Sequence, residues 1–230
     1  MSKHLVIVGA GPGLALENAR RFGSNDHRVT LLGRTPSRLD ALVEELAGSG
    51  VEVDSRVVDA TDHDALRATL REIDEKNPID VCLFQPGGTG GELFDVLEAT
   101  VENVRGNLEL LTLGAVAVGE ALVPAMIARG SGAVVFVGGG SARQPLRFFG
   151  NLGPAMAGMR NYAMTLDRAL KNTGVTSSFF TVAGMITDGE PNEQQIRVGD
   201  LSERIVRLVA EQGPNEVLMT PAGEVSLKSK

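Results

Sequence analysis

Glycines near the N-terminus are the first residues whose spacing points to chemistry. They lie in the run Val8-Gly9-Ala10-Gly11-Pro12-Gly13-Leu14, between a short apolar segment and a helical pattern. Glycine at a strand-to-helix turn lets the backbone approach a pyrophosphate, whose charge is stabilised by the N-terminus of the helix. The residues expected to contact a dinucleotide are Gly9, Gly11, Pro12, Gly13 and Leu14. A tight turn that packs the helix against the strand without a ligand is the alternative.

The second apolar segment ends in Leu31-Leu32-Gly33-Arg34-Thr35. About 20 residues after the glycines, dinucleotide-binding units carry an acidic residue for the ribose of NAD(H), or an arginine for the extra phosphate of NADP(H). This stretch holds no carboxylate, whereas Arg34 presents a planar cation and Thr35 a hydroxyl group, with Arg38 one helical turn later. The stretch therefore favours NADP(H) over NAD(H). An arginine exposed in a loop, with no ligand, is the alternative.

Apolar segments alternate with helical patterns along the chain. Several of these segments are continuous, which is typical of parallel strands covered on both faces. The predicted strands are Leu5–Val8, Arg28–Leu32, Glu52–Val58, Val81–Phe84, Ala133–Val137, Thr176–Val182 and Val217–Thr220. The predicted helices are Pro12–Phe22, Pro36–Ala47, Asp62–Lys76, Val101–Arg129, Leu152–Asn172 and Leu201–Gln212. We expect Val123-Pro124 to bend or end the fourth helix, because proline lacks the backbone donor that a helix needs.

This alternation predicts an α/β fold, Rossmann-like and doubly wound, with a seven-stranded parallel sheet and helices on both faces. Neither a linker, an internal repeat nor a low-complexity tract divides the 230 residues, so we expect one dinucleotide-binding domain over residues 1–230. The 43% of hydrophobic residues, together with 28 glycines, exclude a disordered chain. Glycine, proline, asparagine or charge interrupts each apolar run before about 18 residues, so no transmembrane segment is expected.

The net charge of −7 argues against nucleic acid and anionic membrane as partners. Cys82 is the single cysteine, which fits a reducing, cytoplasmic location, and within a central strand we interpret it as an inert buried thiol. His4, His27 and His63 are far apart, so we expect surface histidines and no metal site. There is one tyrosine, Tyr162.

These elements and motifs resemble those of the short-chain dehydrogenase/reductase family over nearly the whole chain. Gly9, Gly13 and Ala15 occupy the places of its Gly-x-x-x-Gly-x-Gly motif, with alanine as the last. Four further segments follow the family's order. Val58-Asp59-Ala60-Thr61 resembles the turn whose aspartate contacts adenine, and Phe84-Gln85-Pro86-Gly87 stands in the place of Asn-Asn-Ala-Gly. Leu122-Val123-Pro124-Ala125-Met126 resembles Leu-Pro-x-Met, and Val182-Ala183-Gly184-Met185-Ile186 stands in the place of Pro-Gly-x-Val. The resemblance implies further cofactor contacts from Asp59, Ala60, Gly87 and Ile186.

The family's acid–base residues are missing from the matching positions. Members use a tyrosine that exchanges a proton with the substrate, a lysine four residues later, a serine that binds the substrate oxygen and an asparagine in a water relay. The segment Gly153–Arg160 resembles the family's residues after that tyrosine. The resemblance then puts Leu152 at the tyrosine, Met156 at the lysine, Gly139 at the serine and Leu111 at the asparagine. Leucine and methionine carry no titratable proton, so catalysis of the family's type is not expected there.

Other residues offer little replacement for that machinery. Tyr162 has Leu166 four residues on instead of a lysine, so we expect it in the core or an interface. Ser141 is close in sequence to Gly139, while Arg143 and Arg160 suit an anion but are poor proton donors.

Three functions therefore stay open. We prefer an NADP(H)-binding protein with a degenerate active site, acting as a binding or regulatory protein. The second is an NADP-dependent oxidoreductase that acts on a small carbonyl or imine through non-standard residues. The third is a structural scaffold with a vestigial nucleotide site, against which the joint presence of Gly9, Gly13, Arg34 and Asp59 argues. The sequence names no substrate.

The resemblance also carries expectations about assembly and substrate access. It implies a homo-oligomer, a dimer or tetramer, formed through the helices Leu108–Met126 and Leu152–Asn172. Only about a dozen residues separate Thr187 from the helix expected at Leu201, too short a segment to close over much substrate. Phe148 and Phe149 form either an apolar pocket wall or a cap on the core.

Overall fold

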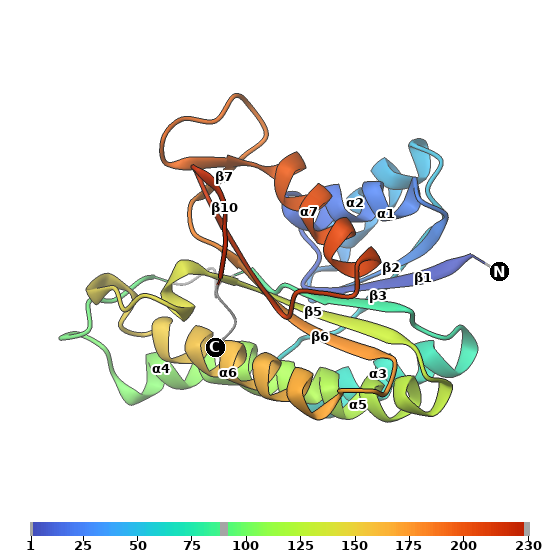
Figure 1. Cartoon of the computed structure of the whole chain (residues 1–230), viewed down its shortest axis with the longest axis horizontal. Coiled ribbons are helices and arrows are strands. Elements are labelled where there is room, and N and C mark those ends of the chain that lie inside the picture. Colours follow the sequence, from blue (N-terminus) through green and yellow to red (C-terminus); the bar gives the residue numbers. More distant parts are fainter. Residues whose placement is uncertain (1, 88–91, 228–230) are drawn as a thin grey trace.

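An eight-stranded sheet with the order β10-β9-β6-β5-β4-β1-β2-β3 carries the fold (Figure 1). This computed structural model describes residues 2–87 and 92–227. Its strands are β1 (Lys3–Val8), β2 (His27–Gly33), β3 (Val53–Val57), β4 (Val81–Phe84), β5 (Gly132–Gly139), β6 (Val175–Val182), β9 (Glu216–Thr220) and β10 (Gly223–Val225). The seven predicted strands are present and run parallel; the short β10, which was not predicted, adds antiparallel to β9.

Helices cover both faces of the sheet, with α1, α2 and α7 on one side and α3, α5 and α6 on the other (Figure 1). The helices are α1 (Leu14–Gly23), α2 (Pro36–Gly48), α3 (His63–Lys76), α4 (Val101–Asn107), α5 (Gly114–Arg129), α6 (Gly153–Ala169) and α7 (Val198–Ala210). A separate pair of short strands, β7 (Met185–Thr187) and β8 (Gln195–Arg197), precedes α7. The Rossmann-like, doubly wound α/β fold is confirmed.

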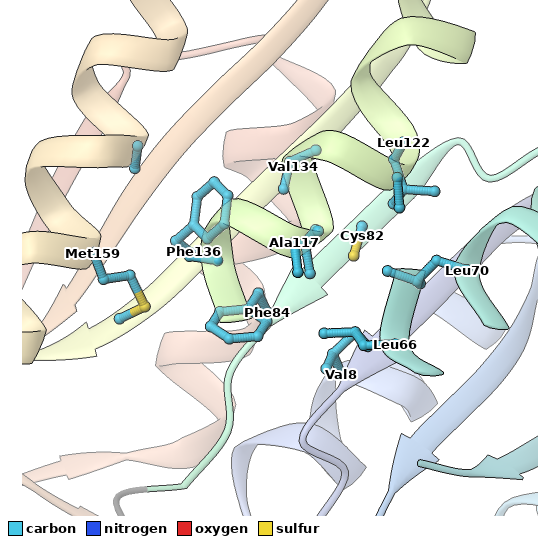
Figure 2. Packing of buried hydrophobic residues seen from close by; sticks show 14 of the residues in the cluster. Val8, Leu66, Leu70, Cys82, Phe84, Ala117, Leu122, Val134, Phe136 and Met159 are labelled. Carbon is cyan, nitrogen blue, oxygen red and sulfur yellow. The ribbon is translucent and has the colours of Figure 1, made fainter. Parts of the chain in front are cut away.

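The alternation of side chains along β1 explains the two layers of helices. Leu5 and Ile7 pack in the cluster beneath α1, α2 and α7, whereas Val6 and Val8 pack in the cluster beneath α3, α5 and α6. Figure 2 shows part of the second cluster, where Val8 lies near side chains of α3, β4 and α5. Cys82 is buried there, as expected, and burial raises the pKa of its thiol to about 12.

One continuous helix from Val101 to Arg129 combines α4, a π-helical segment η1 (Leu108–Leu113) and α5. Pro124 was expected to bend or end this helix. It does not end the helix, because α5 continues to Arg129. The carbonyl of Glu120, which lacks a helical partner at Pro124, accepts instead from Arg71 at 3.5 Å. By length and composition this helix is apolar enough to cross a membrane, contrary to expectation, but 56% of its apolar stretch is buried inside the molecule.

Helices α5 and α6 approach closely at a glycine. A Cβ at Gly119 of α5 would lie 2.0 Å from the hydroxyl oxygen of Tyr162 of α6, so a larger residue there would require the Tyr162 side chain to move. The Tyr162 ring packs against Phe136, with ring centroids 5.9 Å apart. Burial, and then the charge of Glu120, raise the pKa of Tyr162. The tyrosine therefore belongs to the packing between these two helices.

His4 is buried, so the expectation of a surface histidine is wrong for this residue. Its Nε2 lies 2.9 Å from the Thr30 hydroxyl oxygen, and its Nδ1 lies 3.1 Å from the carbonyl oxygen of Asn77. Burial lowers the pKa of His4. Both partners are distant in sequence, so the residues around His4 gave no indication of them.

Candidate nucleotide-binding cleft

A cleft follows the carboxyl ends of the parallel strands and consists of three adjoining cavities. Their volumes are about 190, 490 and 770 Å³, and we call them the first, second and third cavity. The first and second share Gly9 and Gly87, and the second and third share Gly139 and Gly184. The first two meet between β1 and β4, where the strand order reverses. Open α/β sheets bind ligands at this switch point.

The turn after β1 is held against the turn after β4 at the switch point. Gly9 has φ +90, and a Cβ there would lie 2.4 Å from the Cα of Pro86. Its N–H and that of Ala10 donate to the carbonyl of Leu32 at 3.0 and 2.9 Å, which ties the turn to β2 as well. Gly9 is therefore the residue that lets three strand ends meet.

The N-terminus of α1 opens directly onto the second cavity. Gly11 and Gly13 line it, and a Cβ at either position would meet no atom within 4 Å. The first N–H groups of a helix lack partners within the helix and carry partial positive charge. Open space beside these donors fits the diphosphate of a dinucleotide.

The first cavity collects side chains from the ends of β2 and β3. Arg34, Thr35 and Asp59 line it, as does Arg38 at the start of α2. The carboxylate of Asp59 accepts from the backbone N–H of Thr61 at 2.9 Å and from its hydroxyl at 2.8 Å. These bonds, with a smaller contribution from the charge of Arg34, lower the pKa of Asp59, which is therefore an ionised acceptor at neutral pH.

The cleft brings all the predicted cofactor residues to the first two cavities. They are Gly9, Gly11, Pro12, Gly13, Leu14, Arg34, Thr35, Asp59, Ala60, Gly87 and Ile186. Gln85, which was not predicted as a site residue, also lines the second cavity, and its Oε1 accepts from the buried amide of Asn18 at 2.9 Å. A polar Asn18 on the inward face of α1, among Ala15, Ala19 and Phe22, was the available signal.

Three of the four family catalytic positions line the cleft. Met156 lies in the second cavity, Leu152 in the third, and Gly139 in both. Leu152 and Met156 are one turn apart at the start of α6, so their side chains approach the cleft from the same side. Leu111 does not join them: it is fully buried within η1.

The third cavity has apolar and polar walls. Its apolar side chains include Leu146, Phe149, Leu152 and Leu218, and its polar ones include Ser141, Gln144, Gln194 and Thr220. Phe149 thus forms part of a pocket wall and also packs on the core, whereas Phe148 is exposed. The short segment before α7 contributes Gln194, and α7 starts at Val198, three residues earlier than predicted.

Few groups in the cleft titrate. Among the described residues that line the three cavities, the titratable side chains are Arg34, Arg38, Asp59 and Arg143. Tyr162 is not among the lining residues of the cavities. Arginine stays protonated, and Asp59 lies in the first cavity, away from Leu152. No described side chain beside Leu152 and Met156 therefore exchanges a proton near neutral pH.

Arg143, which lines the third cavity, pairs with Glu216. Glu216, at the start of β9, also accepts from Arg160 of α6, whose Nε lies 2.5 Å from Oε1 and whose Nη2 lies 2.9 Å from Oε2. Desolvation alone would raise the pKa of Glu216, but the bonds and charges of the two arginines outweigh it and lower the pKa below its usual 4.5.

Replacing Glu216 by glutamine is expected to lower the free energy of unfolding by about 2 kcal/mol near pH 7, because hydrogen bonds to charged groups contribute about 1.5–3 kcal/mol. The depressed pKa means that the ionised carboxylate stabilises the folded state above the unfolded pKa of 4.5, and that this stability is lost as the pH falls through the folded pKa. Urea unfolding of both proteins at about pH 7 and pH 3 measures it. A difference as large at the lower pH as at the higher one contradicts the prediction.

Known proteins resemble this chain in sequence or in fold. 3-Dehydrosphinganine reductase of Arabidopsis thaliana is 32% identical over 129 residues, which are 56% of this chain and only 38% of the plant protein. A short-chain dehydrogenase from Rhodopseudomonas palustris superposes with a TM-score of 0.82 at 22% identity, covering 95% of this chain and 98% of the other. L-Sorbose reductase from Gluconobacter frateurii, solved with NADPH and L-sorbose, gives 0.79 at 21% identity, covering 92% and 90%.

The sequence profile of the family described as short chain dehydrogenase matches residues 3–196. This match runs from β1 through the cleft-forming turns and into β8. The chain therefore belongs to the short-chain dehydrogenase family.

Proposed function

We propose that the chain, as one domain over residues 1–230, binds NADP(H) along the first and second cavities and lacks the family's proton-coupled catalysis. One observation carries the proposal: Leu152 and Met156 line the cleft, and no described side chain beside them exchanges a proton near neutral pH. A dinucleotide-responsive binding or regulatory protein fits this combination. The NADPH present in the sorbose reductase structure supports the choice of dinucleotide.

An oxidoreductase that acts on a small carbonyl or imine through non-standard residues is the second candidate. The third cavity favours it, because about 770 Å³ of space adjoining the second cavity is room for a substrate. Pockets of about 300–1,000 Å³ are typical of small-molecule sites. In this case hydride transfer would rely on positioning and exclusion of water, with Ser141 as the nearby hydroxyl.

Titration with NADPH and NADH, followed by stopped-flow measurement of hydride transfer to a panel of carbonyl compounds, separates these candidates. Saturable NADPH binding without oxidation supports the binding protein. Measurable turnover supports the oxidoreductase and overturns the binding protein. Failure to bind either nucleotide overturns both and leaves a scaffold.

Arg34→Ala is expected to weaken NADPH binding by about 10- to 100-fold, because a charge-assisted hydrogen bond is worth about 1.5–3 kcal/mol. NADH has no 2′-phosphate, so its dissociation constant should change by less than about threefold. Isothermal titration with both nucleotides measures the effect. Arg56→Ala is the matched control, since Arg56 pairs with Asp54 on β3 and does not line the cleft. Equal losses for NADPH and NADH would count against the assignment of Arg34.

We further propose a cytoplasmic homo-oligomer formed through the helices Leu108–Met126 and Leu152–Asn172. Leu113, on the first of these segments, and Ile127, which directly follows it, support the proposal, because both are exposed apolar side chains. Sedimentation velocity tests it, and a monomer at micromolar concentration overturns it.

A further inference from the structure

Arg143 gives the third cavity its charge. Of the lining residues that the structure describes, it is the one with a formal charge; the other polar ones are neutral hydroxyls and amides. It follows the short helix η2 (Gly140–Ala142) after β5, and its N–H donates to the carbonyl of Gly140 at 3.0 Å. This bond holds the backbone of Arg143 at the same strand end as Gly139.

The charge of Arg143 is only partly balanced by its neighbours. Arg160 binds both carboxylate oxygens of Glu216, and Arg143 shares one of them. Two arginines and one ionised glutamate leave a net charge of +1 in this group of three. Arg143 lines the cavity, whereas Arg160 and the mostly covered carboxylate of Glu216 do not, so Arg143 is the member of this group that a ligand in the cavity would meet.

The other lining residues of the third cavity indicate which chemical groups a ligand would have besides an anionic one. Leu146, Phe149, Leu152 and Leu218 offer apolar surface, which favours an apolar body of a ligand. The guanidinium group is suited to a carboxylate, because its donors match the two oxygens in one plane. The cavity adjoins the second cavity at Gly139, Val182 and Gly184, so such a ligand would lie beside the dinucleotide.

We propose that the third cavity binds an organic carboxylate with an apolar body, and that Arg143 holds its carboxylate group. The proposal rests on the proposed function in that it assigns the ligand class of the cavity beside the dinucleotide. A purely structural Arg143, which ties η2 to β9 through Glu216, is the competing interpretation. The two differ in one measurable property, the preference for an anionic over a neutral ligand of the same shape.

Phenylacetate and phenylacetamide provide that comparison, because they differ only in the charged group. Their dissociation constants would be measured by saturation-transfer NMR, with and without saturating NADPH. We expect phenylacetate to bind at least about tenfold more tightly than the amide to the wild-type protein. Comparable affinity of the wild-type protein for the two compounds overturns the proposal.

Two variants then assign the preference to a residue. Arg143→Gln should reduce the preference to less than about twofold. Arg147→Gln is the matched control: Arg147 is exposed, pairs with Asp95 at 2.6 Å and does not line the cavity, so the preference should persist. Loss of the preference in the control, or its survival in a folded Arg143→Gln protein, overturns the assignment.

Measuring NADPH binding alongside phenylacetate binding distinguishes failure of the carboxylate site from failure of the proposed function. NADPH binding without a phenylacetate preference overturns the carboxylate site and leaves the proposed function intact. A phenylacetate preference in a protein that does not bind NADPH overturns the proposed function and leaves the carboxylate site standing.

Discussion

A variant with Gly139→Ser, Leu152→Tyr and Met156→Lys is expected to oxidise NADPH with a reactive carbonyl compound at least about 100-fold faster than the wild-type protein. A positioned general acid contributes about 10²- to 10⁴-fold to such a step. The new tyrosine would supply that proton, and the lysine one turn later would lower its pKa. Steady-state NADPH oxidation with a carbonyl panel, monitored by the loss of its absorbance, measures the gain.

The cleft has room for these side chains. A Cβ at Gly139 would meet no atom within 4 Å. Leu152 lines the third cavity, into which a larger side chain can extend. Met156 lines the second cavity, and a lysine has a similar unbranched stem with its ammonium at the tip.

A control with Gly139→Ser, Leu152→Phe and Met156→Lys keeps the aromatic ring and removes the hydroxyl group. Its rate of NADPH oxidation should remain close to that of the wild-type protein. Tyr162→Phe, added to the active variant, should leave its rate unchanged, because Tyr162 packs between α5 and α6. Equal rates for the tyrosine and phenylalanine variants, both with normal NADPH affinity, would show that Leu152 is not at the proton-donor position.

Gly9→Ala is expected to lower the free energy of unfolding by about 3 kcal/mol, a size associated with backbone strain and overpacking. The added carbon would lie 2.4 Å from Cα and 2.5 Å from N of Pro86, and these backbone atoms cannot rotate away. The left-handed backbone at φ +90 adds to the cost for a residue with a side chain. Urea unfolding followed by circular dichroism measures the loss.

Gly11→Ala, in the same turn, is the matched control. Its Cβ would meet no atom within 4 Å and its φ is not in the left-handed region, so stability should change by less than about 1 kcal/mol. The methyl group would enter the space at the N-terminus of α1, so NADPH affinity should fall instead. Similar losses of stability in the two variants would contradict the distinct roles of the two glycines.

The sequence was most informative where a structure depends on neighbouring residues. The glycine turn and the end of β2 are local patterns, and both predicted groups of side chains line the cleft. The strands β7 and β10, with three residues each, are too short for a periodic pattern and depend on distant pairing. The hydrogen bond between Asn18 and Gln85 likewise joins residues 67 positions apart. The contact of Arg71, on α3, with the carbonyl that Pro124 leaves without a helical donor joins residues 49 positions apart as well.

The position of Tyr162 beside Gly119 has a spectroscopic consequence. The chain has one tyrosine and no tryptophan, so its intrinsic ultraviolet emission comes from a single ring between α5 and α6. That emission reports on the contact between these two helices, where a partner subunit is proposed to bind. The fluorescence of bound NADPH would have little protein background, so both events can be followed in one sample without an added label.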